Sequence, residues 1–341
     1  VFGMGPGLEP PTRVNRPTDR QPAPHYGTHW DLGAGYLAIP EPETHAIRIY
    51  DLRLCQPDAE GRPGNPTLVT EVGGFGIGLG RYRSPQGLFI GGDPLTLLVC
   101  DKDNGRLVET RLGLSQKEPL GFTLTAARVR RALNIGQIRK GPGAWQHPWV
   151  PRPVDVERAG DGTTFVLCEL AREVIVLDRD WRAIGRFAAP PDRPWVHPVA
   201  LGWNEAQGRL YVADEGAGLV HVLDREGQSL ASIGTDRLRR PTAVAFDSAQ
   251  RVLVMDRERC VLSIFDSQGN WVEDRGGPGL GREEFFGPTD VDVDGRDNLF
   301  VLDHGNHRGM VFDGKGAWFQ AFGSRLYTKP ARFPAGGEET E

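Results

Sequence analysis

Residues 288–323, PTDVDVDGRDNLFVLDHGNHRGMVFDGKGAWFQAFG, contain four short apolar runs separated by three turn sequences. The runs are TDVDV, NLFVLD, GMVFD and WFQAF, and the turns between them are DGRDN, HGNHR and DGKG. Gly, Asn and Asp tolerate positive φ or hydrogen-bond their own backbone, so they close tight turns. The stretch therefore predicts a four-stranded antiparallel sheet. One such sheet cannot bury both of its faces, so it requires further copies in the chain.

Copies of this unit recur upstream, and the chain begins a new one about every 45 residues. Clear copies start at Pro153, Pro198, Pro241 and Pro288, a degenerate copy starts at Pro85, and the earliest covers 29–51. A period near 45 with four strands per unit is the signature of a β-propeller. The predicted fold class is all-β, a six-bladed β-propeller of four-stranded antiparallel blades.

The predicted domain is a single propeller over 1–323, followed by a C-terminal tail at 324–341. Its blades are expected at about 17–74, 85–121, 153–188, 198–234, 241–276 and 288–323. The segment 122–150 is interpreted as an insertion, and its TAARVRRALN sequence predicts a short helix. Residues 52–72 are interpreted as a polar excursion. Val1–Gly3 are expected to pair with the last blade and close the ring.

Composition narrows the class of protein. The formal net charge of -5 argues against a nucleic-acid surface, and no apolar run is long enough to span a bilayer, so a soluble domain is expected. The four cysteines are too sparse for a disulfide scaffold or a zinc motif. The preference for Arg over Lys suggests a bacterial source. Because the chain begins with Val1, a leader or lipid anchor is left open, and an extracytoplasmic location is favoured over a cytoplasmic one.

The last blade resembles the NHL repeat, through its opening PTDVDVD, its central LFVLDHGNHRGMVFD and its final FG. The resemblance implies a six-bladed propeller, and NHL propellers bind proteins, bind RNA or act as lyases. Among them, peptidylglycine amidating lyases carry a zinc whose histidine ligands follow a strand-opening Pro-His. Here the order is His197–Pro198, and other blades open with Pro85–Gln86 and Pro288–Thr289. The metal motif of that family is therefore not retained.

Three histidines stand at or just before the first strand of a blade, namely His29, His147 and His197. In one interpretation they meet at the mouth of the central channel, with Asp303 as a further partner, and bind zinc or calcium. In the other, each packs beside a neighbouring Trp or Pro, and no cofactor is predicted. Five acids recur at the ends of second strands, and we expect them to cap the following turns: Asp101, Glu169, Asp214, Asp256 and Asp303.

The segment 122–150 is basic within an acidic chain, and it also carries two tryptophans. Arg and Trp are enriched at interface hot spots, so these residues form a candidate partner-binding surface, although a solvated loop or a contact with lipid headgroups remains an alternative. They are Arg128, Arg130, Arg131, Arg139, Lys140, Trp145 and Trp149.

The function predicted first is a non-catalytic scaffold or accessory subunit that binds a protein partner within a larger bacterial assembly. The alternative is a metal-dependent lyase or hydrolase with its site at the channel mouth.

Overall fold

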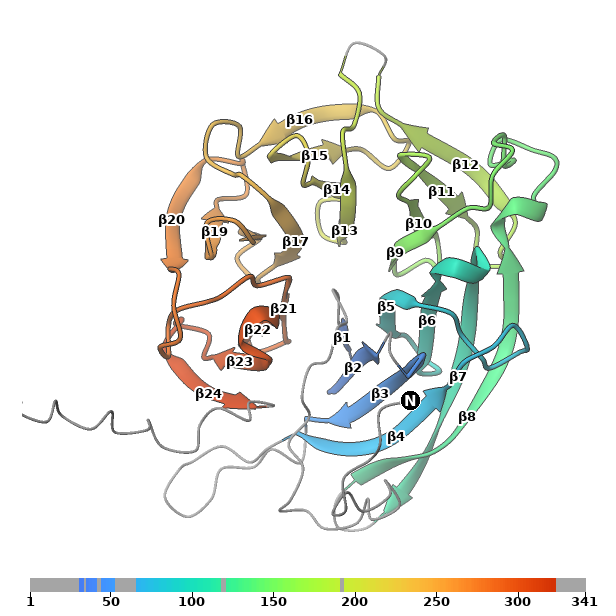
Figure 1. Ribbon diagram of the computed structural model, residues 1–341, viewed down its shortest axis with the longest axis horizontal. Coiled ribbons are helices and arrows are strands. Elements are labelled where there is room, and N and C mark those ends of the chain that lie inside the picture. The colour runs from blue at the N-terminus through green and yellow to red at the C-terminus, as the bar shows by residue number, and fades with distance from the viewer. Residues whose placement is uncertain are drawn as a thin grey trace, which may run out of the picture.

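A computed structural model describes residues 31–33, 35–41, 44–52, 66–117, 121–190 and 193–322. Six four-stranded antiparallel sheets form a ring (Figure 1). Each sheet is one blade, and its strands follow one another in chain order from the channel to the rim. The six-bladed all-β propeller is therefore confirmed.

The first three blades differ in the lengths of their strands. Blade 1 comprises β1 (Asp31–Gly33), β2 (Tyr36–Glu41), β3 (Ala46–Asp51) and β4 (Thr67–Gly73). Blade 2 comprises β5 (Pro85–Gly91), β6 (Thr96–Asp101), β7 (Arg106–Lys117) and β8 (Gly121–Asn134). Blade 3 comprises β9 (Pro153–Arg158), β10 (Thr164–Cys168), β11 (Glu173–Leu177) and β12 (Ala183–Ala188).

The last three blades are more uniform. Blade 4 comprises β13 (Pro198–Asn204), β14 (Arg209–Asp214), β15 (Leu219–Leu223) and β16 (Ser229–Ile233). Blade 5 comprises β17 (Pro241–Phe246), β18 (Val252–Asp256), β19 (Val261–Phe265) and β20 (Trp271–Gly276). Blade 6 comprises β21 (Asp290–Val293), β22 (Leu299–Asp303), β23 (Arg308–Phe312) and β24 (Trp318–Phe322). In the described part of the chain, three short 3₁₀ turns lie between strands: η1 (Lys102–Asn104), η2 (Ile135–Gln137) and η3 (His304–Asn306).

The core lies in the seams between adjacent blades. Alternate residues of a central strand face opposite seams: Val166 and Cys168 pack towards blade 2, whereas Phe165 and Leu167 pack towards blade 4. A strand buried on both faces needs apolar residues at every position, which explains the unbroken run in TFVLC. The seam between blades 6 and 1 is packed in the same way, by a cluster that includes Leu37, Tyr50 and Phe322. The ring therefore closes through packing, as in other radial repeats.

The helix expected in TAARVRRALN is wrong. Residues 121–134 form β8, which pairs with β7 along its whole length, with Arg111 opposite Arg128. All 12 residues of β7 pair with the 14-residue strand β8, and this pairing overrides the helix propensity of the Ala and Arg residues. The first part of the segment interpreted as an insertion thus belongs to blade 2. The rest, 135–150, connects blade 2 to blade 3.

Several expectations fall on residues outside the described ranges. They are the strand role of Val1–Gly3, the position of His29, the tail 324–341 and most of the excursion 52–72. No helix among the described residues is long and apolar enough to cross a membrane.

Candidate contact face

The topology gives the ring two different faces. In each blade, the loop between the second and third strands lies on the same face as the connection to the next blade, because successive strands are antiparallel. We call the residues of these loops and connections the connection face. The loops between first and second strands and between third and fourth strands make up the turn face.

Buried aspartates fix the connections to the blades. The carboxylate of Asp214 accepts hydrogen bonds from the backbone N–H groups of Val196 and His197 in the incoming connection, and from Gly216 and Ala217 in its own loop. Burial opposes its ionisation, yet the hydrogen bonds from His221 and from the backbone N–H groups together lower the pKa of Asp214 to about 2. The expected capping role is thus confirmed at this position.

The same cap recurs in three other blades, and one predicted member is wrong. Asp101, Asp256 and Asp303 each accept a backbone N–H from the incoming connection. In blade 3 the equivalent residue is Cys168, which pairs with Pro153 as Asp214 pairs with Pro198. Glu169 therefore stands one position beyond the cap.

Two connections are held by a buried arginine as well. The Arg308 guanidinium lies 2.7 Å from the Asp303 carboxylate and donates to the carbonyl oxygens of Leu280, Gly281 and Glu284. Its side chain is 2% exposed. Arg106 makes the equivalent contacts in blade 2, with Asp101 and the carbonyls of the loop before β5. The buried positions of Arg106 and Arg308, and their contacts with the connections, were not predicted from the sequence.

The two loops whose carbonyl groups are bound by Arg106 and Arg308 expose apolar side chains to solvent. The carbonyls of Ile77 and Leu280 are bound at equivalent positions by Arg106 and Arg308, while their side chains are 75% and 68% exposed. Parallel bridges between Phe75 and Tyr82 and between Pro278 and Phe285 close both loops. Because the backbone is tied internally, the exposed side chains cannot simply fold back into the core.

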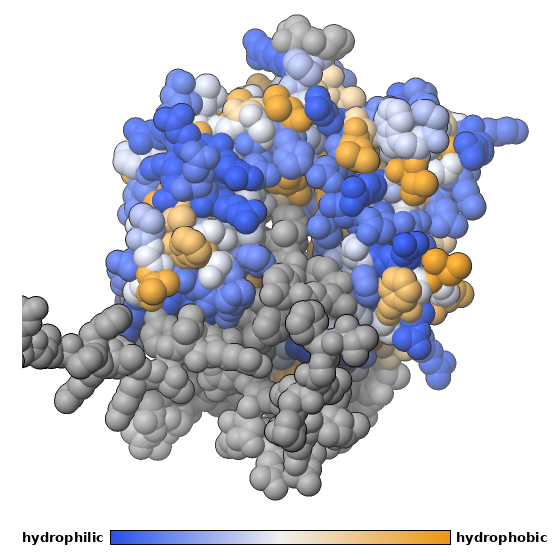
Figure 2. All heavy atoms as spheres, viewed as in Figure 1, coloured by the Kyte–Doolittle hydropathy of each residue, from blue (hydrophilic) through white to orange (hydrophobic). Residues whose placement is uncertain are grey.

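Other exposed apolar residues occupy the same face. Those of the connection face are Phe75, Ile77, Leu79, Trp149, Val150, Leu170, Val196, Leu280 and Phe286. The remaining exposed large apolar residues among those described lie on the outer strands, and none lies in a described turn-face loop. They come from separate loops, and Figure 2 shows apolar patches around the ring with hydrophilic residues between them.

Among the described residues, cations outnumber acids in the exposed charged positions of the connection face. The cations are Arg81, Arg83, Arg139, Lys140, Arg172, Arg193, Arg237, Arg239, Arg240 and Arg282. The exposed acids are Asp103, Asp236, Glu258, Glu283 and Glu284. The face is therefore cationic in a chain whose formal net charge is -5.

An arc of charged side chains lies on this face, at the ends of the first two strands of successive blades. Lys102 lies 3.1 Å from Glu169, which lies 2.9 Å from Nε2 of His197. Nδ1 of His197 lies 3.1 Å from Glu215, which also pairs with Arg240. Burial opposes ionisation of Glu169, but the hydrogen bond from His197 and the charge of Lys102 hold its pKa below the usual range.

The structure does not bring His147 and His197 to one site. His147 stacks on Trp149 and pairs with Glu173 at the start of β11, whereas His197 is held between Glu169 and Glu215. Asp303 is occupied by Arg308. Among the described residues, no group of three or more His, Cys, Asp and Glu side chains is placed to hold a metal ion. His29 lies outside those residues.

The predicted partner-binding residues are divided between different roles. Arg139, Lys140 and Trp149 are exposed on the connection between blades 2 and 3, and Arg128 and Arg130 are exposed on the outer strand β8. Charged side chains on an edge strand also discourage pairing with other sheets.

Two members of the predicted surface are structural. Arg131 pairs with Glu109 and lies over the ring of Trp181. Trp145 is 6% exposed, and its indole N–H donates to the Trp149 carbonyl.

The comparisons with known proteins support the fold. A family model described as a six-bladed β-propeller matches residues 238–321, within the connection to blade 5 and blades 5 and 6. No curated protein matches the sequence.

Solved structures resemble the whole ring. A streptogramin B lyase superposes with a TM-score of 0.57 at 10% identity, over 88% of this chain and 83% of that chain. Selenomethionine-substituted virginiamycin B lyase from Staphylococcus aureus gives 0.55 at 8% identity, over 90% and 88%. A catalytically inactive variant of that lyase with quinupristin also gives 0.55 at 8% identity, over 90% and 89%. At such identities the likeness concerns the fold alone.

Proposed function

We propose that the protein is a non-catalytic binding propeller that docks a protein partner on its connection face, as an accessory subunit of a larger assembly. The supporting observation is the pair of internally bonded loops that hold Ile77 and Leu280 in solvent. Exposed apolar side chains on a pre-ordered backbone lose little conformational entropy on binding, which favours association. Grouped on one face, they are typical of an interaction site.

The charge of the face indicates the partner's chemistry. Exposed arginines, Arg81 and Arg282, belong to the same two loops as the apolar tips. The complementary partner surface has apolar recesses with an acidic rim, because opposite potentials steer encounter and apolar anchors supply affinity. We expect the association rate to fall as ionic strength rises.

The test is a substitution that removes the apolar tips without touching the arginines below them. The partner is isolated from the native source, purified, and its affinity for the propeller is measured by calorimetry. Ile77→Ser combined with Leu280→Ser is expected to weaken binding by about tenfold or more, as for loss of two interface anchors. Leu230→Ser is the matched control, because Leu230 is 51% exposed but lies on the outer strand β16.

Equal affinity of both variants and the wild type would remove the connection face as the docking site. Deletion of 122–150 is unsuitable as a test, because it removes β8 and leaves the third strand of blade 2 unpaired along its outer edge.

A second candidate function, catalysis at the channel mouth, is favoured by His197. Its imidazole lies between two carboxylates and is 46% exposed, so it can exchange protons with a bound substrate. The similarity in fold to streptogramin B lyases is consistent with a lyase. This proposal predicts that His197→Ala abolishes turnover in a lyase or hydrolase screen, and that zinc or calcium bound after purification is lost from the same variant. Turnover that His197→Ala leaves unchanged would contradict it.

A further inference from the structure

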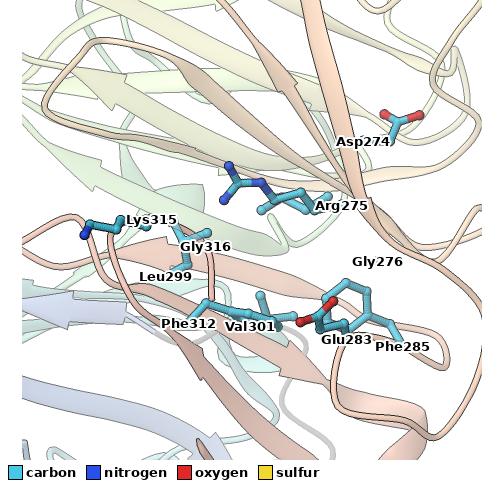
Figure 3. A pocket seen from close by; sticks show the side chains of 11 residues that line it. Asp274, Arg275, Gly276, Glu283, Phe285, Leu299, Val301, Phe312, Lys315 and Gly316 are labelled. Carbon is cyan, nitrogen blue, oxygen red and sulfur yellow. The ribbon is translucent and has the colours of Figure 1, made fainter. Parts of the chain in front are cut away.

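The seam between blades 5 and 6 contains a cavity of about 370 Å³ (Figure 3), and a smaller one of about 170 Å³ lies between blade 4 and the connection from blade 3. The floor of the larger cavity is apolar and is made by Leu262, Phe285, Leu299, Val301 and Phe312. Its charged lining residues are Asp274, Arg275, Glu283 and Lys315. The volume falls at the lower end of the range for small-molecule sites.

The cavity arises from a single exchange in the repeat. Each outer strand places one side chain opposite the second residue of the third strand, and in blades 3 and 4 these side chains are Phe187 and Ile233. Both are buried. In blade 5 the equivalent residue, opposite Leu262, is Arg275.

The neighbouring blade shows that the positions correspond. Phe187 lies against Gly227, Ile233 against Gly269 and Arg275 against Gly316, and each of these glycines has positive φ in the turn between third and fourth strands. A large apolar side chain therefore covers two seams, and a cation stands over the third. Arg275 of blade 5 therefore occupies the position at which blades 3 and 4 have a large apolar side chain.

The charged residues around the cavity differ in their ion-pair and hydrogen-bond partners. Asp274 is engaged by Arg259, Ser263 and Trp271. Arg275 pairs with Glu273 on its own strand, and both residues are half-buried. Lys315 has no carboxylate partner among the described residues. In Figure 3, Lys315 and Arg275 lie towards one end of the cavity and Glu283 lies beside Phe285 at the other.

We propose that this seam cavity binds a small amphipathic monocarboxylate. The apolar body lies on the floor formed by Phe312 and Val301, and the carboxylate accepts hydrogen bonds from the Arg275 guanidinium and the Lys315 ammonium. Arg275 exchanges Glu273 for the ligand, because a guanidinium binds a carboxylate through two parallel N–H groups. Glu283 at the far end disfavours a second negative charge on the ligand.

The test uses 3-phenylpropionate as the probe and 3-phenylpropionamide as its neutral counterpart, with binding measured by ligand-observed NMR and calorimetry. We expect the carboxylate to bind and the amide to bind about tenfold more weakly, because the amide loses both charge-assisted contacts. Lys315→Gln, in an exposed turn, is expected to weaken carboxylate binding several-fold. Arg275→Ile restores the residue type of blade 4 and is expected to abolish binding.

Three results would overturn the proposal: failure of the carboxylate to bind the wild-type protein, equal binding of the amide, or unchanged binding by Arg275→Ile. If Arg275→Ile raises the thermal midpoint while the wild type binds no carboxylate, the cavity is a packing defect. Should Arg275→Ile fail to fold, the proposal is tested by the amide comparison, which leaves the protein unchanged, and by Lys315→Gln, which changes an exposed residue of a turn.

Discussion

Both faces of the ring carry loops that reverse the chain between antiparallel strands, but different side chains hold these loops in place on each face. On the turn face, most described turns of blades 3 to 6 are closed by an exposed or half-buried aspartate, whereas Asp247 and Asn204, which close two others, are buried. Asp266, for example, accepts the backbone N–H groups of Gln268 and Asn270. On the connection face, longer loops are held by fully buried carboxylates, and in blades 2 and 6 by a buried ion pair. Among the described turn-face loops, none is held by an arginine as fully buried as Arg308, whose side chain is 2% exposed.

The largest effect should come from the buried ion pair. Arg308→Met removes the guanidinium that neutralises Asp303 and binds three loop carbonyls, so we expect a loss of about 3–5 kcal/mol in the free energy of unfolding. Urea unfolding at pH 7 measures it. The turn-face control is Arg225→Met, which breaks a pair with Asp161 in which the two side chains are 43% and 53% exposed; its expected cost is below about 1 kcal/mol.

The pH dependence of the Arg308→Met variant tests whether Asp303 is ionised in the folded protein. Burial raises the pKa of Asp303, and hydrogen bonds from Phe286 N–H, Asn306 and Arg308 oppose the rise. Without Arg308 the pKa should rise further. A carboxyl with a raised folded-state pKa favours folding below its unfolded-state pKa, and this advantage is lost as pH rises through the folded-state pKa. The penalty of Arg308→Met should therefore be smaller at pH 4 than at pH 7. An equal penalty at both would contradict a buried, ionised Asp303.

A smaller effect is expected from the aspartate cap of blade 4. Because the pKa of Asp214 is lowered to about 2, its ionised form contributes about 2 kcal/mol of stability above pH 4. That contribution is lost as pH falls towards 2. Asp214→Asn should therefore be destabilised at pH 7 and approach the wild type below pH 3, as followed by urea unfolding. Asp266→Asn on the turn face is the control, and its difference from the wild type should be smaller at pH 7.

The sequence predicted the propeller because its period and its turn residues are local signals. Runs such as TFVLC and VLVMD need apolar side chains on both faces, which only a strand between two seams requires. The aspartate caps were predictable for the same reason. In blade 3 the pattern misled, because FVLCE offers Glu169 one residue after the true cap position, and only the pairing of Cys168 with Pro153 fixes the register.

The missed features depend on contacts between distant residues. The β8 strand could not be recognised, because its structure is set by pairing with an unusually long β7 rather than by its own propensities. The buried arginines did leave a signal: D-x-x-N-x-R occurs at 101–106 and 303–308, each paired with a G-L-G-R loop about 25 residues upstream. Arg275 left none, since an arginine on an outer strand looks like solvent-facing charge until the neighbouring blade is in place.

The smallest effect should come from the loop tips themselves. Because Ile77 and Leu280 are 75% and 68% exposed, Ile77→Ser with Leu280→Ser should change the free energy of unfolding by no more than about 0.5 kcal/mol per site. Urea unfolding of the isolated protein measures this. A loss well above 1 kcal/mol would mean that the side chains pack against the ring in solution and are not available to a partner. Near-neutral stability combined with weakened binding would separate the two roles of the connection loops, with buried charge holding the backbone in place and exposed apolar tips contacting the partner.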